Sequence, residues 1–183
     1  MKKAMIALLA VTLYGSALSA QSPAEVIEAA VGETPNRFPG TASLIRWNPD
    51  HTYETIREGT NNLVCFDRSD ERARPPFAAQ CTHIGNLERV TQNRRFRAET
   101  NDTDGENARI AAAEADGTRV QPVYGSIWLR MDGADAATAR LHGTVAVPGA
   151  TAAALGLPDN GADGVVWLMD GGTSAAHLMI PGR

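Results

Sequence analysis

Several residue types and patterns are scarce in this chain of 183 residues, and each scarcity excludes a class of protein. The two cysteines, Cys65 and Cys81, are too few for the paired CxxC motifs of a thiolate zinc site. The apolar run at 4–14 is shorter than the roughly 18 to 20 residues that a membrane-spanning helix needs. No GxSxG, Walker, GxGxxG or HExxH motif occurs after residue 20, so no established catalytic signature is present.

The first 20 residues have the layout of a secretory signal peptide. Lys2 and Lys3 precede the apolar run, and small residues follow it up to Ala20. We expect cleavage after Ala20, which leaves a single domain, 21–183, long enough to bury a real core. A transmembrane anchor is the alternative, but it needs a longer apolar run. The sequence therefore predicts an exported protein, periplasmic or secreted, without membrane insertion after removal of 1–20.

The domain 21–183 is acidic, and all of its basic residues other than histidine are arginine. Removing Lys2 and Lys3 leaves 15 Arg against 21 Asp and Glu, a formal charge of −6. Such a balance disfavours nucleic acid and anionic lipid as partners, because both attract clustered positive charge. The concentrated basic stretch is Arg89, Arg94, Arg95 and Arg97. At helical spacing, a run of this kind is typical of a solvated helix face.

Capping signals predict a short helix at the start of the domain. Ser22 and Glu25 fit a capping box, and Pro23 suits the first helical position. Gly32 is a suitable left-handed terminator. The apolar side of this helix is expected to pack on the domain.

From Thr41 onward, short apolar segments alternate with turn residues, as is typical of a sheet. Short gaps between the first three segments favour antiparallel hairpins, with Gly59-Thr60-Asn61 as one of the turns. A second group of strands is expected near the C-terminus, where a hairpin turn at 170–173 joins the last two. The predicted strands are 41–47, 52–58, 62–66, 122–131, 139–147, 164–169 and 174–180.

The middle of the chain predicts loops and helices. Residues 67–80 are charged and contain two adjacent prolines, which favours a surface loop. Residues 82–98 carry Ile84, Leu87 and Val90 at three-residue intervals, which predicts a helix after the second cysteine. A polar turn is expected at 101–107, followed by a short helix at 107–115.

Together these elements predict an α+β fold. We expect a mostly antiparallel sheet of about six or seven strands, with a barrel-like curvature as one version of the prediction. The N-terminal helix and one helix after the second cysteine complete the fold.

Cys65 allows three hypotheses: a nucleophile, a metal ligand or half of a disulfide. Thiols of exported proteins tend to be oxidised, and an even pair favours one bridge. A disulfide between Cys65 and Cys81 closes a loop that would stabilise the fold by about 3 kcal/mol in the chain-entropy model. A nucleophilic Cys65 would instead need a nearby His83, His142 or His177. The sequence favours the disulfide and assigns no catalytic residue.

Two histidines form a second candidate site. His142 and His177 lie on strands that we expect in the same sheet, so their imidazoles would converge if those strands pair. Zinc or copper would then need a third or fourth ligand from other residues. The alternative is two half-buried histidines that are hydrogen-bonded near strand starts. The sequence favours no cofactor, with zinc or copper at His142 and His177 as the other possibility.

Three stretches carry a resemblance to a known family: IREGTNNLVC at 56–65, the run at 141–158 and the segment at 164–181. Together they resemble a family of small exported bacterial proteins. In that family a GTN element precedes a cysteine, and a second cysteine follows a proline-containing loop. The chain then ends in a Trp-containing hairpin with a His before a terminal Pro. The resemblance spans about 46–181 and implies one exported domain, without a specific activity, cofactor or catalytic residue.

The function favoured by the sequence is therefore a non-catalytic exported domain that binds a partner or contributes to the cell envelope. A metal-binding or small-ligand-binding protein, or an enzyme, that uses His142 and His177 is the competing hypothesis. An exported inhibitor of another protein is a third. The partner is expected to be a protein or a small molecule and not a nucleic acid.

Overall fold

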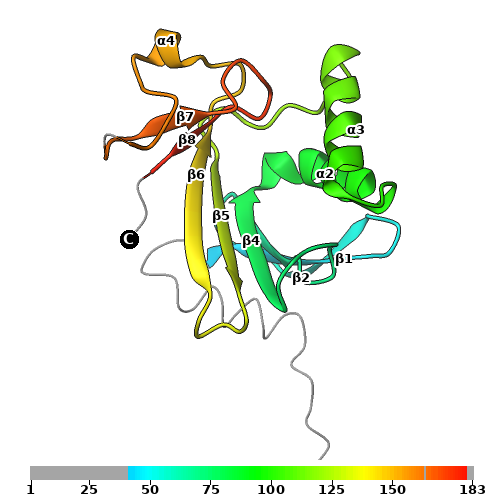
Figure 1. The fold of residues 1–183 in the computed structure, drawn as a ribbon. Helices are drawn as coiled ribbons and strands as arrows, with labels where there is room; N and C mark the ends of the chain where they lie inside the picture. The colour runs from blue at the N-terminus through cyan, green and yellow to red at the C-terminus, as the bar shows by residue number, and fades with distance from the viewer. Residues whose placement is uncertain (1–40, 163, 181–183) are drawn as a thin grey trace, which may run out of the picture.

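The structure, a computed structural model, describes residues 41–162 and 164–180 (Figure 1). The predicted signal peptide, 1–20, and the predicted helix that begins near Ser22 lie outside the described residues. Within them, the fold is mixed α/β, with eight strands in one mostly antiparallel sheet and three α-helices. The sheet curves around α2 but is not closed into the barrel that one version of the prediction allowed.

Each of the seven predicted strands overlaps a strand of the structure. The order in the sheet is β2-β1-β3-β4-β5-β6-β8-β7. The strands are β1 (Ser43–Trp47), β2 (Tyr53–Arg57), β3 (Leu63–Asp67), β4 (Phe77–His83), β5 (Ile127–Gly133), β6 (Arg140–Ala146), β7 (Trp167–Met169) and β8 (His177–Met179). The helices are the 3-10 turn η2 (Ile84–Asn86) and the α-helices α2 (Leu87–Ala98), α3 (Thr103–Ala115) and α4 (Ala152–Leu155).

The eighth strand, β4, was missed by the sequence analysis, which predicted six or seven strands. Its first half was assigned to the loop 67–80 and its end to a helix. β4 lies in the middle of the sheet, paired with β3 on one side and β5 on the other. Its sequence, FAAQCTH, is mostly small or polar and is buried along most of its length. A strand covered on both faces shows no alternation of apolar and polar residues, so periodicity does not reveal it.

The connection between β2 and β3 is a crossover and not the predicted hairpin turn. β3 pairs with β1 in parallel, so the chain passes from the edge strand β2 across the start of β1. The backbones are so close there that a Cβ on Gly59 would lie 2.5 Å from the Thr41 carbonyl oxygen. That oxygen accepts the Thr60 amide at 2.7 Å, and the Asn61 side chain donates to Thr41 Oγ1 at 2.7 Å. The GTN element therefore has a structural role.

Cys65 and Cys81 lie directly opposite each other in the antiparallel register of β3 and β4. Their Sγ atoms are 2.08 Å apart, at disulfide distance, which is the pairing that the sequence favoured. Both residues are buried with Ala42, Leu44 and Leu63 on the side of the sheet that faces away from α2. The two cysteines are therefore part of the core.

On its other side, the central sheet packs against α2 (Figure 1). Ile45, Val64 and Phe66 from β1 and β3 contact Leu87 and Val90 from the first turns of the helix. Ile84, which the sequence analysis placed on the same apolar face, belongs instead to η2 and is 47% exposed. The apolar contact is thus confined to the start of α2.

The helix α3 starts earlier than predicted. The segment 101–107, expected to be a polar turn, contains its cap and first turn: Asp102 accepts the Gly105 amide at 2.8 Å. Asp104 and Glu106 lie in this first turn, where negative side chains favour the helix dipole. None of the helices within 41–162 and 164–180 has the length and apolar character needed to cross a membrane.

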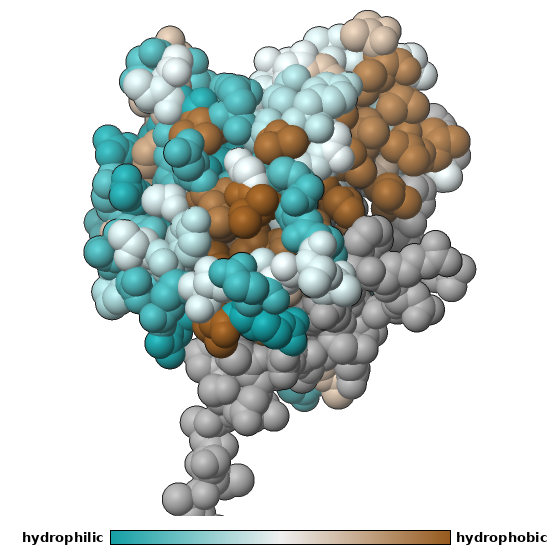
Figure 2. Space-filling model, turned by 180° about the vertical axis from the view of Figure 1, so that it is seen from behind, coloured by the Kyte–Doolittle hydropathy of each residue, from teal (hydrophilic) through white to brown (hydrophobic). Residues whose placement is uncertain are grey.

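An exposed apolar region lies over α4 and the edge strand β7, on the side of the molecule seen in Figure 2. Its large side chains are Leu155, Val165, Met169 and Ile180, each more than one-third exposed. This region lies at the opposite end of the sheet from the edge strand β2.

The crossover gives a test of the fold. Gly59→Ala is expected to lower the free energy of unfolding by about 2–3 kcal/mol, because the added methyl group overlaps the backbone at the start of β1. Gly143→Ala is the matched control, since among the described residues a Cβ there meets the end of the Leu129 side chain alone, at 3.4 Å. Chemical denaturation of both variants measures the difference. Equal stability of the two variants would contradict the crossover geometry.

Candidate functional site

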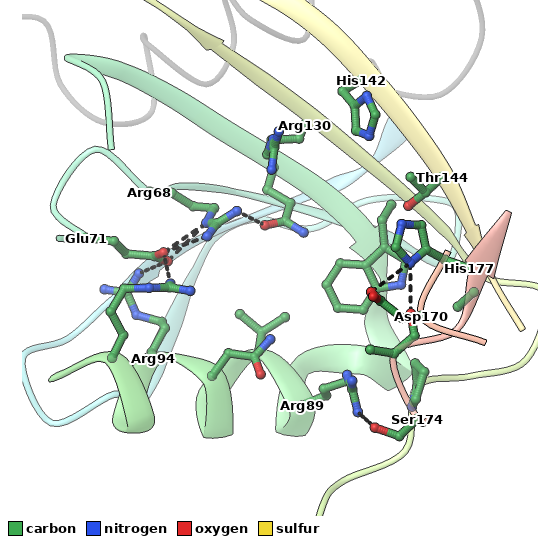
Figure 3. A pocket seen from close by; sticks show the side chains of 18 of the residues that line it. Arg68, Glu71, Arg89, Arg94, Arg130, His142, Thr144, Asp170, Ser174 and His177 are labelled. Carbon is green, nitrogen blue, oxygen red and sulfur yellow. Dashed lines mark hydrogen bonds and ion pairs between the residues drawn. The ribbon is translucent and has the colours of Figure 1, made fainter. Parts of the chain in front are cut away.

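A cavity of about 320 Å³ lies between α2 and the sheet (Figure 3). One wall is formed by β4, β5 and β6, and the facing wall is α2. The loop 68–76 lines one end, and the turn between β7 and β8 lines the other. The fold thus brings together side chains that are up to about a hundred positions apart in the sequence.

The strand register arranges the sheet wall in three rows. Residues two apart on a strand share a face, so alternate positions of β5 and β6 point towards α2. The rows are Gln80–Arg130–His142, Trp128–Thr144 and Ala146–His177. A cationic row is therefore separated from the row of His177 by the indole of Trp128 and the hydroxyl of Thr144.

The facing wall is a largely polar face of α2. Its members follow helical spacing and are Arg89, Val90, Asn93, Arg94 and Arg97. The expectation that the basic run is a solvated face is therefore wrong for most of its members: Arg89 and Arg94 are only 5% and 7% exposed. Arg95, which points away from this face, is the exposed member. Arginines occupy the buried face because the loop 68–76 and the cavity provide polar partners that an apolar core would lack.

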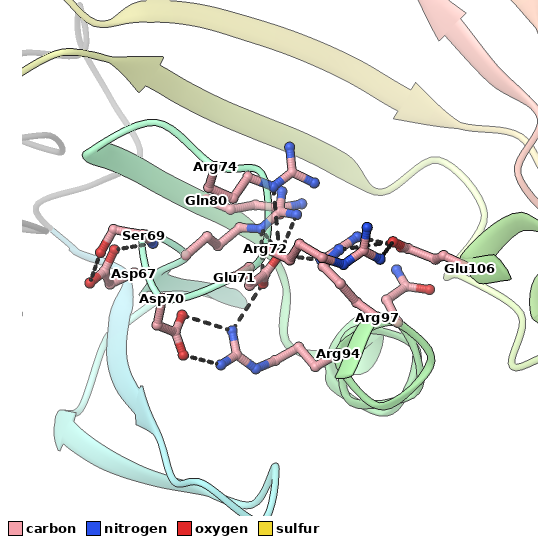
Figure 4. A network of polar contacts seen from close by, with 12 residues as sticks. Asp67, Ser69, Asp70, Glu71, Arg72, Arg74, Gln80, Arg94, Arg97 and Glu106 are labelled. Carbon is pink, nitrogen blue, oxygen red and sulfur yellow. Dashed lines mark hydrogen bonds and ion pairs between the residues drawn. The ribbon is translucent and has the colours of Figure 1, made fainter. Parts of the chain in front are cut away.

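At one end of the cavity, Glu71 is the centre of a buried ionic network (Figure 4). Arg68 donates to its carboxylate from Nε at 3.1 Å and from Nη2 at 2.7 Å. Arg94 donates from Nη1 at 2.9 Å, and Arg97 makes a further short contact. Arg74 is farther away, with its Nε 3.6 Å from Glu71 Oε2. The predicted surface loop is therefore anchored in the interior at Arg68 and Glu71.

The charges in this network are not balanced by Glu71 alone. Burial raises the pKa of Glu71, but hydrogen bonds from Arg68 and the charges of Arg68, Arg97 and Arg94 outweigh it and hold the pKa below its ordinary value. Arg94 also pairs with Asp70 at 2.5 Å, and Arg97 pairs with Glu106 at 2.6 Å.

Arg74 is the least compensated member of the network. Its contact with Glu71 is the long one, and its Nε makes no hydrogen bond within the part of the chain that the structure describes. Burial lowers the pKa of Arg74, and the charges of Arg68 and Arg97 lower it further, while Glu71 and Asp132 oppose the shift. This guanidinium is therefore held in the cavity wall at an electrostatic cost.

At the other end of the cavity, Arg89 carries a buried charge without a carboxylate in direct contact among the described residues. Its Nη1 donates to the Val120 carbonyl and to Ser174 Oγ, the latter at 2.9 Å. Ser174 in turn donates to Glu114, so the nearest carboxylate acts through a hydroxyl. Burial, together with the charge of Arg119, lowers the pKa of Arg89 to about 10. A buried cation without a carboxylate in direct contact is stabilised by an anion nearby.

The predicted pair His142 and His177 lies in this cavity, on the neighbouring strands β6 and β8 (Figure 3). His177 Nδ1 lies 2.8 Å from the Ala175 carbonyl, which only accepts, so Nδ1 carries the hydrogen. Nε2 is then the acceptor of the neutral ring. Asp170 Oδ2 lies 3.7 Å from the same Nδ1. His177 is thus oriented by the turn that precedes its strand.

His142 faces a cationic environment. Burial, Arg130 and His177 lower its pKa below the ordinary value, and Asp132 opposes this shift. The neutral ring is therefore favoured.

The cavity has the opposite charge to the protein as a whole. Six arginines and two carboxylates line it, which gives a formal charge of +4 with neutral histidines. The complete chain has a formal charge of −4. The arginines are Arg68, Arg74, Arg89, Arg94, Arg97 and Arg130, and the carboxylates are Glu71 and Asp170.

No group of three His, Cys, Asp or Glu side chains that could hold a metal ion occurs within 41–162 and 164–180. Zinc or copper at His142 and His177 stays a prediction. His83, the third histidine considered near Cys65, caps η2 by accepting the Gly85 amide at 3.0 Å.

Most of the cavity was not found by sequence reasoning. The two histidines were named, whereas Arg89, Arg94 and Arg97 were placed on a solvated face, and the arginines of the loop and of β5, like Trp128, were not named. A usable signal was present in α2, where 89, 90, 93, 94 and 97 share one helical face and four of the five are polar. The arginines of the loop and of β5 carry no comparable local signal.

Comparison of the chain with protein-family models, with curated proteins and with solved structures gives no match.

The ionic network gives a second prediction. Glu71→Gln is expected to lower the free energy of unfolding by about 3 kcal/mol, because it leaves buried guanidinium groups without their shared carboxylate. The pKa of Glu71 is lowered by folding, so its contribution is present above the ordinary pKa of glutamate and is lost as pH falls through the folded-state value. Denaturation over a range of acidic pH measures both effects.

Glu99→Gln is the control for this prediction. Glu99 pairs with Arg109 on the surface, where both side chains are about half exposed, so its loss should change stability by less than about 0.5 kcal/mol. If the two variants were equally stable, Glu71 would not be the centre of the network.

Proposed function

We propose that this chain is an exported, non-catalytic binding protein whose cavity takes a small organic anion. The N-terminal pattern at 1–20 and the disulfide between Cys65 and Cys81 support the exported part of the proposal, since disulfides persist in oxidising compartments. The cavity between α2 and the sheet supports the binding part.

The observation that carries the proposal is the buried guanidinium of Arg89. An arginine that is 5% exposed is normally paired with a carboxylate, yet among the residues that the structure describes Arg89 donates directly only to a carbonyl and a hydroxyl. It also lies in the first turn of α2, where the positive end of the helix dipole disfavours a cation. A bound anion would compensate both the desolvation of this charge and its unfavourable position.

The size and lining of the cavity favour a small organic molecule. Its volume lies at the lower end of the range for small-molecule sites. Apolar contact area comes from Val90, Trp128 and Ala146, while polar groups come from the arginines. This combination suits a ligand that has both an apolar body and a negative group.

The proposal is tested by titration calorimetry of the full exported chain with octanoate and with octanamide, in a buffer free of phosphate and sulfate. Octanoate should bind, and octanamide should bind at least about tenfold more weakly, because it lacks the charge that strengthens hydrogen bonds to arginine. Arg95→Gln, on the exposed side of α2, should bind octanoate like the wild-type protein. Equal affinity for the acid and the amide would overturn the proposal.

The pH dependence of binding gives a further prediction. The pKa of His142 is lowered by its protein surroundings, whereas a bound anion would favour the protonated ring. Binding should therefore take up a proton, and octanoate affinity should rise as pH falls from about 7 through the ordinary histidine range. Titrations over this range should show a slope that is reduced in His142→Gln. An affinity that is independent of pH in the wild-type protein would contradict this role.

A further inference from the structure

The two ends of the cavity each hold a cation that lacks full compensation, and an apolar section lies between them. Arg89 lies at the end formed by the β7–β8 turn, where Ser174 contacts it. Arg74 and Arg130 lie at the end formed by the loop 68–76 and the first row of the sheet. Trp128 and Val90 line the section between the ends.

The register sets the length of this arrangement. His142 and Arg130 are paired in the first row, and His177 pairs with Ala146 in the last row. Four residues of β6 separate these rows, which corresponds to about 13 Å along the strand. The sheet rows at the two ends are thus several residues apart, which suits an elongated molecule better than a single small ion.

The acidic groups near each end do not remove the surplus of positive charge. At the first end, Asp170 is half exposed and lies beside His177, while Glu114 serves both Arg89 and Arg119. At the second end, Asp132 forms an ion pair with Arg130 at 2.7 Å and also acts on the charge of Arg74, so one carboxylate is shared between two arginines. Glu71 is shared among four arginines.

We infer that the ligand is a dianion with a negatively charged oxygen group at each end and an apolar middle. One group would contact Arg89, and the other would contact Arg130 and Arg74. The apolar middle would lie against Trp128. This inference rests on the proposed function, because it specifies which anion the same cavity takes.

The test compares suberate with octanoate, two chains of equal carbon number that differ in the second carboxylate. Suberate should bind the full exported chain at least about tenfold more tightly, because a second charge-assisted contact is added. Within the series succinate, adipate, suberate and sebacate, affinity should pass through a maximum at the length that spans the two ends. Both comparisons need only the wild-type protein.

Variants then locate the two contacts. Arg89→Gln and Arg130→Gln should each remove the advantage of suberate over octanoate, while Arg95→Gln should retain it. Thermal unfolding of each variant without ligand shows whether it is folded, which matters most for the buried Arg89.

The outcomes separate the inference from the proposed function. Octanoate that binds as tightly as suberate would overturn the two-ended site and leave the anion-binding function standing. Octanamide that binds as tightly as both acids would overturn the two together, as would the absence of binding by every compound. A preference for suberate that survives in both Arg89→Gln and Arg130→Gln would overturn the assignment of the two ends.

Discussion

The carboxylate of Glu71 holds together parts of the chain that would otherwise repel each other. Arg68 and Arg74 come from the loop after β3, while Arg94 and Arg97 come from α2. All four guanidinium groups lie around one carboxylate that is almost completely buried. The position of α2 above the sheet depends on this charge at one end of the helix and on the apolar contacts of Leu87 and Val90 at the other.

This mixed mode of packing accounts for the cavity. A helix with an apolar face along its whole length would close onto the sheet at the density of a protein core. Guanidinium groups resist such closure because they need hydrogen-bond partners or water. The space between α2 and the first rows of β5 and β6 is therefore polar, and its charge is opposite in sign to that of the chain as a whole. The binding properties proposed for the cavity follow from the same arginines that position the helix.

The success of sequence reasoning varied along the chain for identifiable reasons. The disulfide followed from the count of cysteines and the expected compartment, and the strands at both ends of the sheet followed from alternation and turn residues. β4 was not predicted, because it is covered on both faces and consists mostly of small and polar residues. The GTN element was assigned to a hairpin because a turn and a crossover use the same residue types. Only the parallel pairing of β1 with β3 distinguishes the two.

By itself, the sequence determined the local features: the short strands, the hairpin turn at 170–173, the helix after Cys81 and the presence of two histidines on the C-terminal strands. These features depend on residues that are close together in the chain, so their spacing can be read directly from the sequence. The tertiary structure decided which side of α2 is buried, which strands adjoin, and that arginines from three segments surround one cavity. Those features depend on the pairing of distant segments and on whether nearby charges offset the cost of desolvating each arginine. The neighbours of an arginine in the chain do not show whether it is buried or solvated.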